Sequence, residues 1–177
     1  MLERLPLLLF FTLCSGFSYI CLLSKGLLEK VRNWLLYGQT AAVILFGGAS
    51  MVLLHKTLHL STADFGEYRH SLFIVFALIC GLSFFRVRDL LAIRGFAILL
   101  LFLCDKILDS VFCVEIFLSN VFVVEIYCVI IFSMAIGAAP YIFRDFMDRI
   151  IAGKKSAQLA GCVGCIFAAT ALGMLLI

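Results

Sequence analysis

Residues 156–177 read SAQLAGCVGCIFAATALGMLLI, a run of 22 residues without a charged side chain. Roughly 20 apolar residues are enough for a helix to cross the hydrocarbon core of a bilayer. Small residues fall on two adjacent lines of this helix: Ala160, Gly164 and Ala168, and Gly161, Cys165, Ala169 and Gly173. Such lines let a second helix backbone approach closely. We therefore predict a last transmembrane helix that packs against a helix of the same chain or of another membrane subunit.

The whole chain has the composition of a membrane protein. Hydrophobic residues make up 64% of its 177 residues, and charged residues only 14%. A soluble domain carries about a quarter charged residues, because they cover its surface. Hydrocarbon must therefore surround much of this protein, and the lipid bilayer is its first partner. The net charge is +3, and no basic face with interleaved aromatics occurs, so we expect no nucleic-acid binding.

Further apolar runs predict an all-α polytopic membrane helix bundle of about six transmembrane helices arranged as three hairpins. Residues 1–177 form one domain, with spans at about 5–23, 34–54, 71–87, 90–108, 121–143 and 156–177. The fourth span is the least regular, because it must hold Arg94 near one interface and Asp105 and Lys106 near the other. Its alternative is a half-buried or re-entrant segment.

The basic residues predict the orientation of the chain. Ten of the 14 Lys and Arg residues fall in segments 25–32, 86–94 and 144–155, and the other four lie on the opposite side. Basic loops remain in the cytoplasm during insertion. We therefore expect these three loops to be cytoplasmic and both termini to lie outside, in a bacterial inner membrane or an equivalent one.

One acidic residue, Glu125, lies inside a predicted span. A carboxylate in hydrocarbon costs several kcal/mol unless it is paired or protonated. Three interpretations remain open: Glu125 lies at headgroup depth, pairs with Lys106, or lines a cation or proton path near Asp105 and Lys106.

The histidines and one cysteine pair suggest other chemistry. His55 and His59 are four residues apart, as in helical metal-binding pairs, and His70 follows in the same external segment. The alternative is that these histidines are amphipathic residues at the membrane interface. Cys162 and Cys165 have the CxxC spacing of thiol–disulfide exchange, although their small neighbours suit helix packing equally well.

Three functional hypotheses follow. No Ser/His/Asp set, P-loop, dinucleotide fingerprint or HExxH motif occurs, so we predict neither an enzyme nor a cofactor. The first hypothesis is a non-catalytic membrane subunit or partner-binding helix bundle. The alternatives are a carrier or channel for a small solute or ion, and a membrane redox or metal-binding protein.

Overall fold

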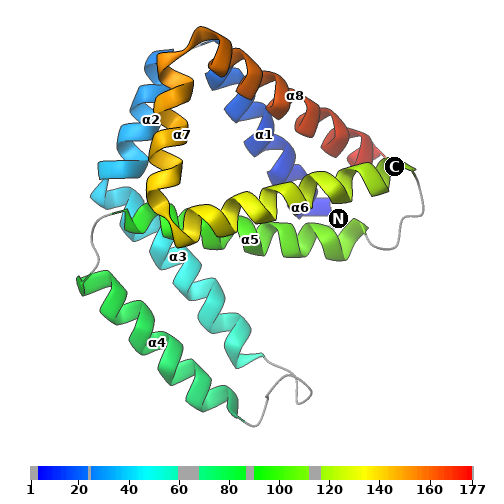
Figure 1. The fold of residues 1–177 in the computed structure, drawn as a ribbon. Coiled ribbons are helices and arrows are strands. Elements are labelled where there is room, and N and C mark those ends of the chain that lie inside the picture. Colours follow the sequence, from blue (N-terminus) through cyan, green and yellow to red (C-terminus); the bar gives the residue numbers. More distant parts are fainter. Residues whose placement is uncertain (1–3, 24, 60–67, 87–89, 112–116, 177) are drawn as a thin grey trace.

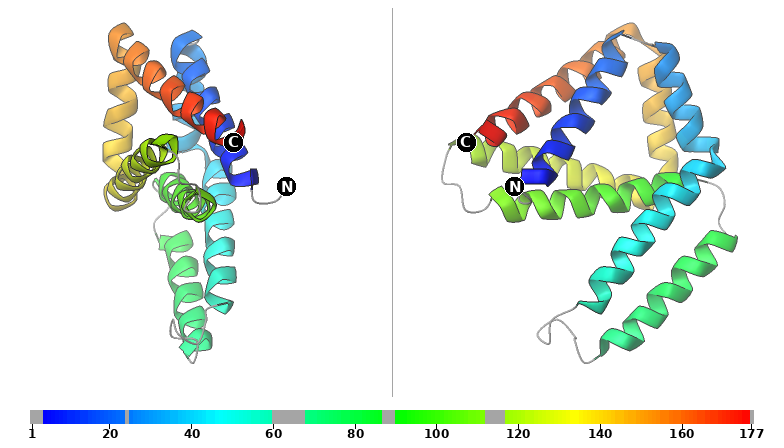
Figure 2. Two further views of the ribbon diagram at one scale, coloured as in Figure 1. Left: turned by 90° about the vertical axis from the view of Figure 1, so that its right-hand side faces the viewer. Right: turned by 180° about the vertical axis from the view of Figure 1, so that it is seen from behind.

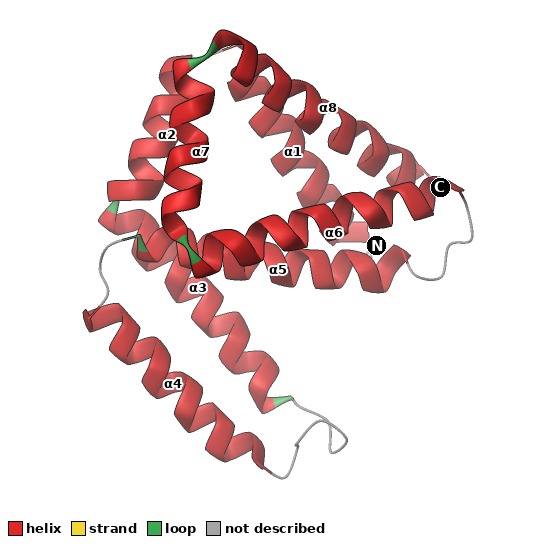
Figure 3. Cartoon of the chain, in the orientation of Figure 1, coloured by secondary structure: helices red, strands yellow, loops and turns green. Residues whose placement is uncertain are grey.

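The computed structural model describes residues 4–23, 25–59, 68–86, 90–111 and 117–176. This part of the chain contains eight α-helices and no strand, so the all-α prediction is confirmed (Figure 3). The helices are α1 Leu5–Leu23, α2 Lys25–Tyr37, α3 Gln39–Leu58, α4 Arg69–Arg86, α5 Leu91–Val111, α6 Phe117–Ala138, α7 Pro140–Ala152 and α8 Lys154–Leu176.

Each predicted span overlaps at least one of these helices, and spans 34–54 and 121–143 each overlap two. Within the described ranges, four helical segments are long and apolar enough to cross a membrane: α1, α3, Leu118–Ala138 of α6, and α8. The apolar part of α4, Arg69–Phe84, is shorter. In α5, four charged residues interrupt the apolar sequence: Arg94, Asp105, Lys106 and Asp109. The structure thus supports a membrane protein, whereas six crossings remain a prediction.

Two of the three predicted basic loops are helical, which corrects the sequence interpretation. Segments 25–32 and 144–155 fall largely within α2 and α7, each 13 residues long. In α7, the buried residues Phe143, Met147 and Ile150 recur at helical spacing. This periodicity is hard to see in the sequence, because the apolar end of each helix is part of a predicted span: 34–37 of span 34–54, and 140–143 of span 121–143. In the third segment, residues 87–89 lie outside the described part.

Backbone chemistry explains where the predicted spans 34–54 and 121–143 are interrupted. Gly38 is extended, with φ −74° and ψ 110°, and separates α2 from α3. A Cβ atom there would overlap the carbonyl oxygen of Trp34. Ala139 separates α6 from α7, because the residue before a proline is disfavoured in the helical region and Pro140 has no N–H to donate.

The helices pack in pairs that form the edges of a triangle (Figures 1 and 2). α1 runs antiparallel to α8, α2 lies against α7, and α5 lies against α6. α3 packs across α5, where Gly95 lets the two backbones approach closely. A Cβ on Gly95 would lie 2.5 Å from the backbone nitrogen of Phe46. α3 and α4 form a hairpin that projects from the triangle.

Two apolar clusters hold the triangle together. One joins α2, α5 and α7 through Leu28, Ile93 and Ile150, each at most 2% exposed. The other joins α1, α5, α6 and α8 through Phe10, Cys104, Phe122 and Ala171. The edge Phe10–Phe122 contact, with ring centroids 5.9 Å apart, ties α1 to α6.

The helix ends separate into two groups. α2, α7, the end of α4 and the start of α5 lie on one side of the molecule (Figure 1). The start of α1, the end of α8, the α3 end and α4 start, and the α5 end and α6 start lie on the other. The first group contains the described parts of the three basic segments, which the predicted topology puts on one side of the membrane.

Candidate functional site

The predicted intramembrane carboxylate makes a contact between two helices. Glu125 lies in the third turn of α6, and Thr170 lies in the C-terminal third of α8. The Thr170 hydroxyl oxygen is 2.6 Å from Glu125 Oε2. Both residues lie in segments that are apolar enough to cross a membrane. A polar pair is thus held within the apolar part of the bundle.

The Thr170 hydroxyl also contacts its own helix. Its oxygen is 3.0 Å from the Phe167 carbonyl oxygen and 3.2 Å from that of Ile166. A hydroxyl has one hydrogen to donate and two lone pairs to accept with. Three oxygen neighbours therefore surround a group that can donate to only one of them well.

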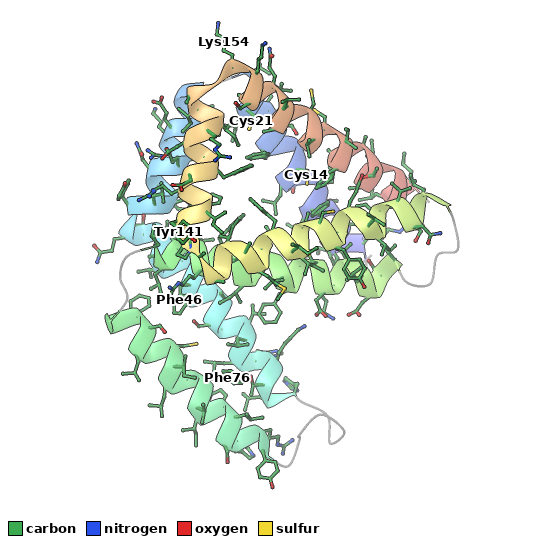
Figure 4. All side chains as sticks on the ribbon, viewed as in Figure 1. Cys14, Cys21, Phe46, Phe76, Tyr141 and Lys154 are labelled. Atoms are coloured by element: carbon green, nitrogen blue, oxygen red, sulfur yellow. The ribbon has the colours of Figure 1, made fainter. Side chains whose placement is uncertain are left out.

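Two thiols on other helices lie near this pair. Cys14 on α1 packs against the apolar cluster that also contains Cys104 on α5 and the neighbours of the pair, Ile126 and Ala171. Cys104 is fully buried in the cluster that joins α1, α5, α6 and α8. Figure 4 shows Cys14 on α1, inside the triangle. Neither thiol is a hydrogen-bond partner of the carboxyl in the described part, so the immediate polar environment of Glu125 is Thr170.

The other two residues of the predicted ion path form separate pairs. Lys106 Nζ is 2.9 Å from Asp109 Oδ2 at the exposed end of α5, and not beside Glu125. Asp105 pairs with Lys56 of α3. The Lys56 ammonium also lies 4.9 Å from the centroid of the Phe102 ring. The Lys56–Asp105 pair connects α3 to α5, whereas the Lys106–Asp109 pair lies within α5.

Two of the three histidines, His55 and His59, lie next to each other, and His70 belongs to another helix. The rings of His55 and His59 are 4.6 Å apart between centroids, at the end of α3. His70 is in the first turn of α4 and is exposed, like the other two. Within the described ranges, no three His, Cys, Asp or Glu side chains are close enough to hold a metal ion. The nearby acidic residues Asp64 and Glu67 lie outside those ranges.

The small residues of the last helix divide between two faces. Gly161, Gly164 and Ala168 are buried, whereas Cys165 and Ala169 are exposed. A Cβ on Gly161 would lie 2.6 Å from Leu22 Cγ, and one on Gly164 would overlap Ser18 Oγ, both in α1. Ala160 is half-buried, and a Cβ on Gly173 would lie 2.9 Å from Leu118 Cδ2 of α6. The buried face therefore packs within the chain.

The CxxC pair lies on the opposite face of α8. Cys162 and Cys165 are both exposed in the apolar part of the helix. A reactive thiol usually needs an electropositive environment that favours the thiolate. Neither cysteine forms a hydrogen bond among the residues that the structure describes. Both lie on an exposed, apolar surface of α8.

Sequence reasoning identified Glu125 but not its partner. Thr170 is the one hydroxyl residue between positions 157 and 177, which was a usable signal, because an isolated polar residue in an apolar helix needs a hydrogen-bond partner. Pairing it with Glu125 required the packing of α6 against α8.

The chain matches no protein-family model, no curated protein and no solved structure.

Proposed function

We propose that this protein is a multi-pass membrane helix bundle that acts as a non-catalytic subunit and binds a transmembrane helix of another membrane protein on its α3–α4 hairpin. The observation that carries this proposal is the packing of α4. None of the described side chains of α4 is buried, and its main neighbour is α3. Leu78 and Leu82 on α4 are 59% and 65% exposed.

The glycines of the hairpin support a helical partner. A Cβ on Gly47, Gly48 or Gly81 would have no atom within 4 Å. Gly95 and Gly164, in contrast, sit where another helix approaches. Glycine costs an exposed helix about 1 kcal/mol relative to alanine, so its use in a span is explained when a backbone packs against it. The free glycine faces of α3 and α4 suit an incoming helix.

The proposed placement in the bilayer has six crossings, by α1, α3, α4, α5, α6 and α8. In it, α2 and α7 lie along the cytoplasmic surface. Both are short, carry charged residues on one face and have exposed aromatic side chains, with Trp34 45%, Tyr37 75% and Tyr141 57% exposed. Tyr and Trp favour the membrane–water interface. Figure 4 shows Lys154, at the corner between α7 and α8, pointing away from the bundle.

Site-specific photo-crosslinking in native membranes tests the partner. We place a photoreactive residue at Leu82 of α4 and, as a control, at Ile166 of α8, which is 56% exposed. We expect one protein–protein product from position 82 and lipid adducts from position 166. Gly81→Ile should abolish the product, because its side chain would fill the proposed contact, whereas Ala169→Ile should not. Lipid adducts alone at position 82, or a product made only of two copies of this chain, would overturn the proposal.

A second candidate function, a carrier for protons or small cations, is favoured by the contact between Glu125 and Thr170. An ionisable residue in a span is often part of an ion path. Proton and cation flux in proteoliposomes distinguishes this function from the first. Flux in the wild type that is lost in Glu125→Gln and retained in Asp105→Asn would support a carrier. Absence of flux in the wild type would eliminate it.

A further inference from the structure

The hydrogen-bond geometry of Thr170 depends on the protonation state of Glu125. If Glu125 is ionised, the Thr170 hydrogen donates to the carboxylate oxygen at 2.6 Å, and the carbonyl oxygens of its own helix, at 3.0 and 3.2 Å, receive no hydrogen from Thr170. If Glu125 is protonated, its O–H donates to Thr170 Oγ1, and the Thr170 hydrogen donates to the carbonyls of its own helix. The protonated arrangement uses both capacities of the Thr170 hydroxyl, because Thr170 then donates once and accepts once.

The surroundings also favour a neutral acid. Among the described residues, Glu125 has no ion pair, since Lys106 pairs with Asp109 and Lys56 with Asp105. The apolar cluster beside the site contains Cys14 of α1 and Cys104 of α5. An uncompensated carboxylate in hydrocarbon costs several kcal/mol, and adding a proton removes that cost.

The position of the pair along the two helices gives its depth in the bundle. Glu125 is eight residues from the start of α6, or about 12 Å at 1.5 Å per residue. Thr170 is six residues from the end of α8. Both helix ends lie on the side of the molecule that carries the termini (Figure 1). Glu125 and Thr170 therefore lie nearer to that side of the molecule than to the other.

We propose that Glu125 and Thr170 form a proton-binding site within the membrane, in which Glu125 is a neutral acid at neutral pH and donates its hydrogen bond to Thr170. The ligand is the proton itself, exchanged with water on the side of the termini. Thr170 positions the acid and does not titrate. The inference rests on α6 and α8 lying in the bilayer, as proposed above, and is independent of the partner on α3–α4.

Dicyclohexylcarbodiimide, an apolar reagent for protonated carboxyls, tests the site in intact membranes. The acid proton moves to a carbodiimide nitrogen and the carboxyl oxygen bonds to the central carbon. The resulting O-acylisourea rearranges to a stable N-acylurea, so no further reactant is needed. We expect modification at Glu125, located by mass spectrometry of peptides, with a rate that falls as the pH rises. Glu125→Gln should remove this modification, and Asp105→Asn should retain it.

Variants at position 170 test the direction of the hydrogen bond. Thr170→Ser keeps the hydroxyl and should preserve modification at neutral pH, whereas Thr170→Val removes the acceptor of the neutral acid and should reduce it severalfold. Increased modification in Thr170→Val would show that threonine donates to an ionised carboxylate. That result, no modification of Glu125 in the wild type, or a rate independent of pH would overturn the proposal. The photo-crosslinking result is unaffected by any of these outcomes.

Discussion

Arg32 of α2 and Asp148 of α7 form an ion pair, with 2.6 Å between Nη2 and Oδ1. The pair joins two short helices that belong to opposite ends of the sequence. The Arg32 side chain is 23% exposed and the Asp148 side chain 47%. The buried Nε of Arg32 has no other partner in the described part of the chain. Most of the contact between α2 and α7 is apolar. The ion pair therefore contributes little to the free energy of packing and mainly fixes how the two helices are aligned.

Loss of this ion pair should cause a small destabilisation. Asp148→Ala removes the partner of a half-buried guanidinium, and we expect a cost of about 1 kcal/mol, because the exposed carboxylate limits the strength of the pair. Thermal unfolding in detergent measures it. Asp145→Ala is the matched control, since Asp145 pairs only with its neighbour Arg144, in an exposed contact. A charge swap, Arg32→Asp with Asp148→Arg, should restore stability. Equal effects of the two alanine variants would contradict this interpretation.

Packing of α1 against α8 should be sensitive to side-chain size at Gly164. Gly164→Val places atoms against Ser18 and the Cys14 backbone, and we expect a loss of about 1–3 kcal/mol, as for other overpacked contacts. Thermal unfolding and the rate of proteolysis in detergent report the change. Ala169→Val adds similar bulk on the exposed face of α8 and should be nearly neutral. If the two variants behave alike, α8 does not pack on α1 through this face.

The proposed topology predicts which surface positions are reachable from each side of the membrane. In a background without the eight native cysteines, we expect Lys30→Cys in α2 to react with a membrane-impermeant maleimide only from the cytoplasm. His59→Cys at the end of α3 should react only from the outside. Both positions are exposed, so accessibility reflects sidedness and not burial. Labelling of both positions from one side would refute the topology.

Metal content should distinguish the histidine cluster from a metal centre. We expect the purified protein to contain no stoichiometric transition metal and to show no absorbance in the visible range, because His55 and His59 have no third ligand within the described ranges. Elemental analysis and a visible spectrum provide the measurement. A bound metal that is lost in His55→Ala but kept in His70→Ala would restore the metal-binding hypothesis and assign the ligand.

Several features were predictable from local sequence. α1 has the predicted bounds, Leu5–Leu23, because an uncharged apolar run specifies both the helix and its length. The sequence also showed that one predicted span contains a carboxyl group, because Glu125 is the one acidic residue in segment 121–143. Helices α2 and α7 were harder to predict, because their basic residues resemble loops between spans while their apolar residues extend the neighbouring spans.

By itself, the sequence determined that this chain is helical, that much of it is apolar enough for hydrocarbon, and where charge is concentrated. These properties depend on residue type and on spacing within one helix. Only the tertiary structure decided that Thr170 meets Glu125, that Gly164 faces α1, and that Arg32 meets Asp148. Each of these contacts joins residues far apart in the chain. Because most side chains of these helices are apolar and similar to one another, many ways of pairing the helices have similar free energies. The choice among them depends on how all the helices pack together.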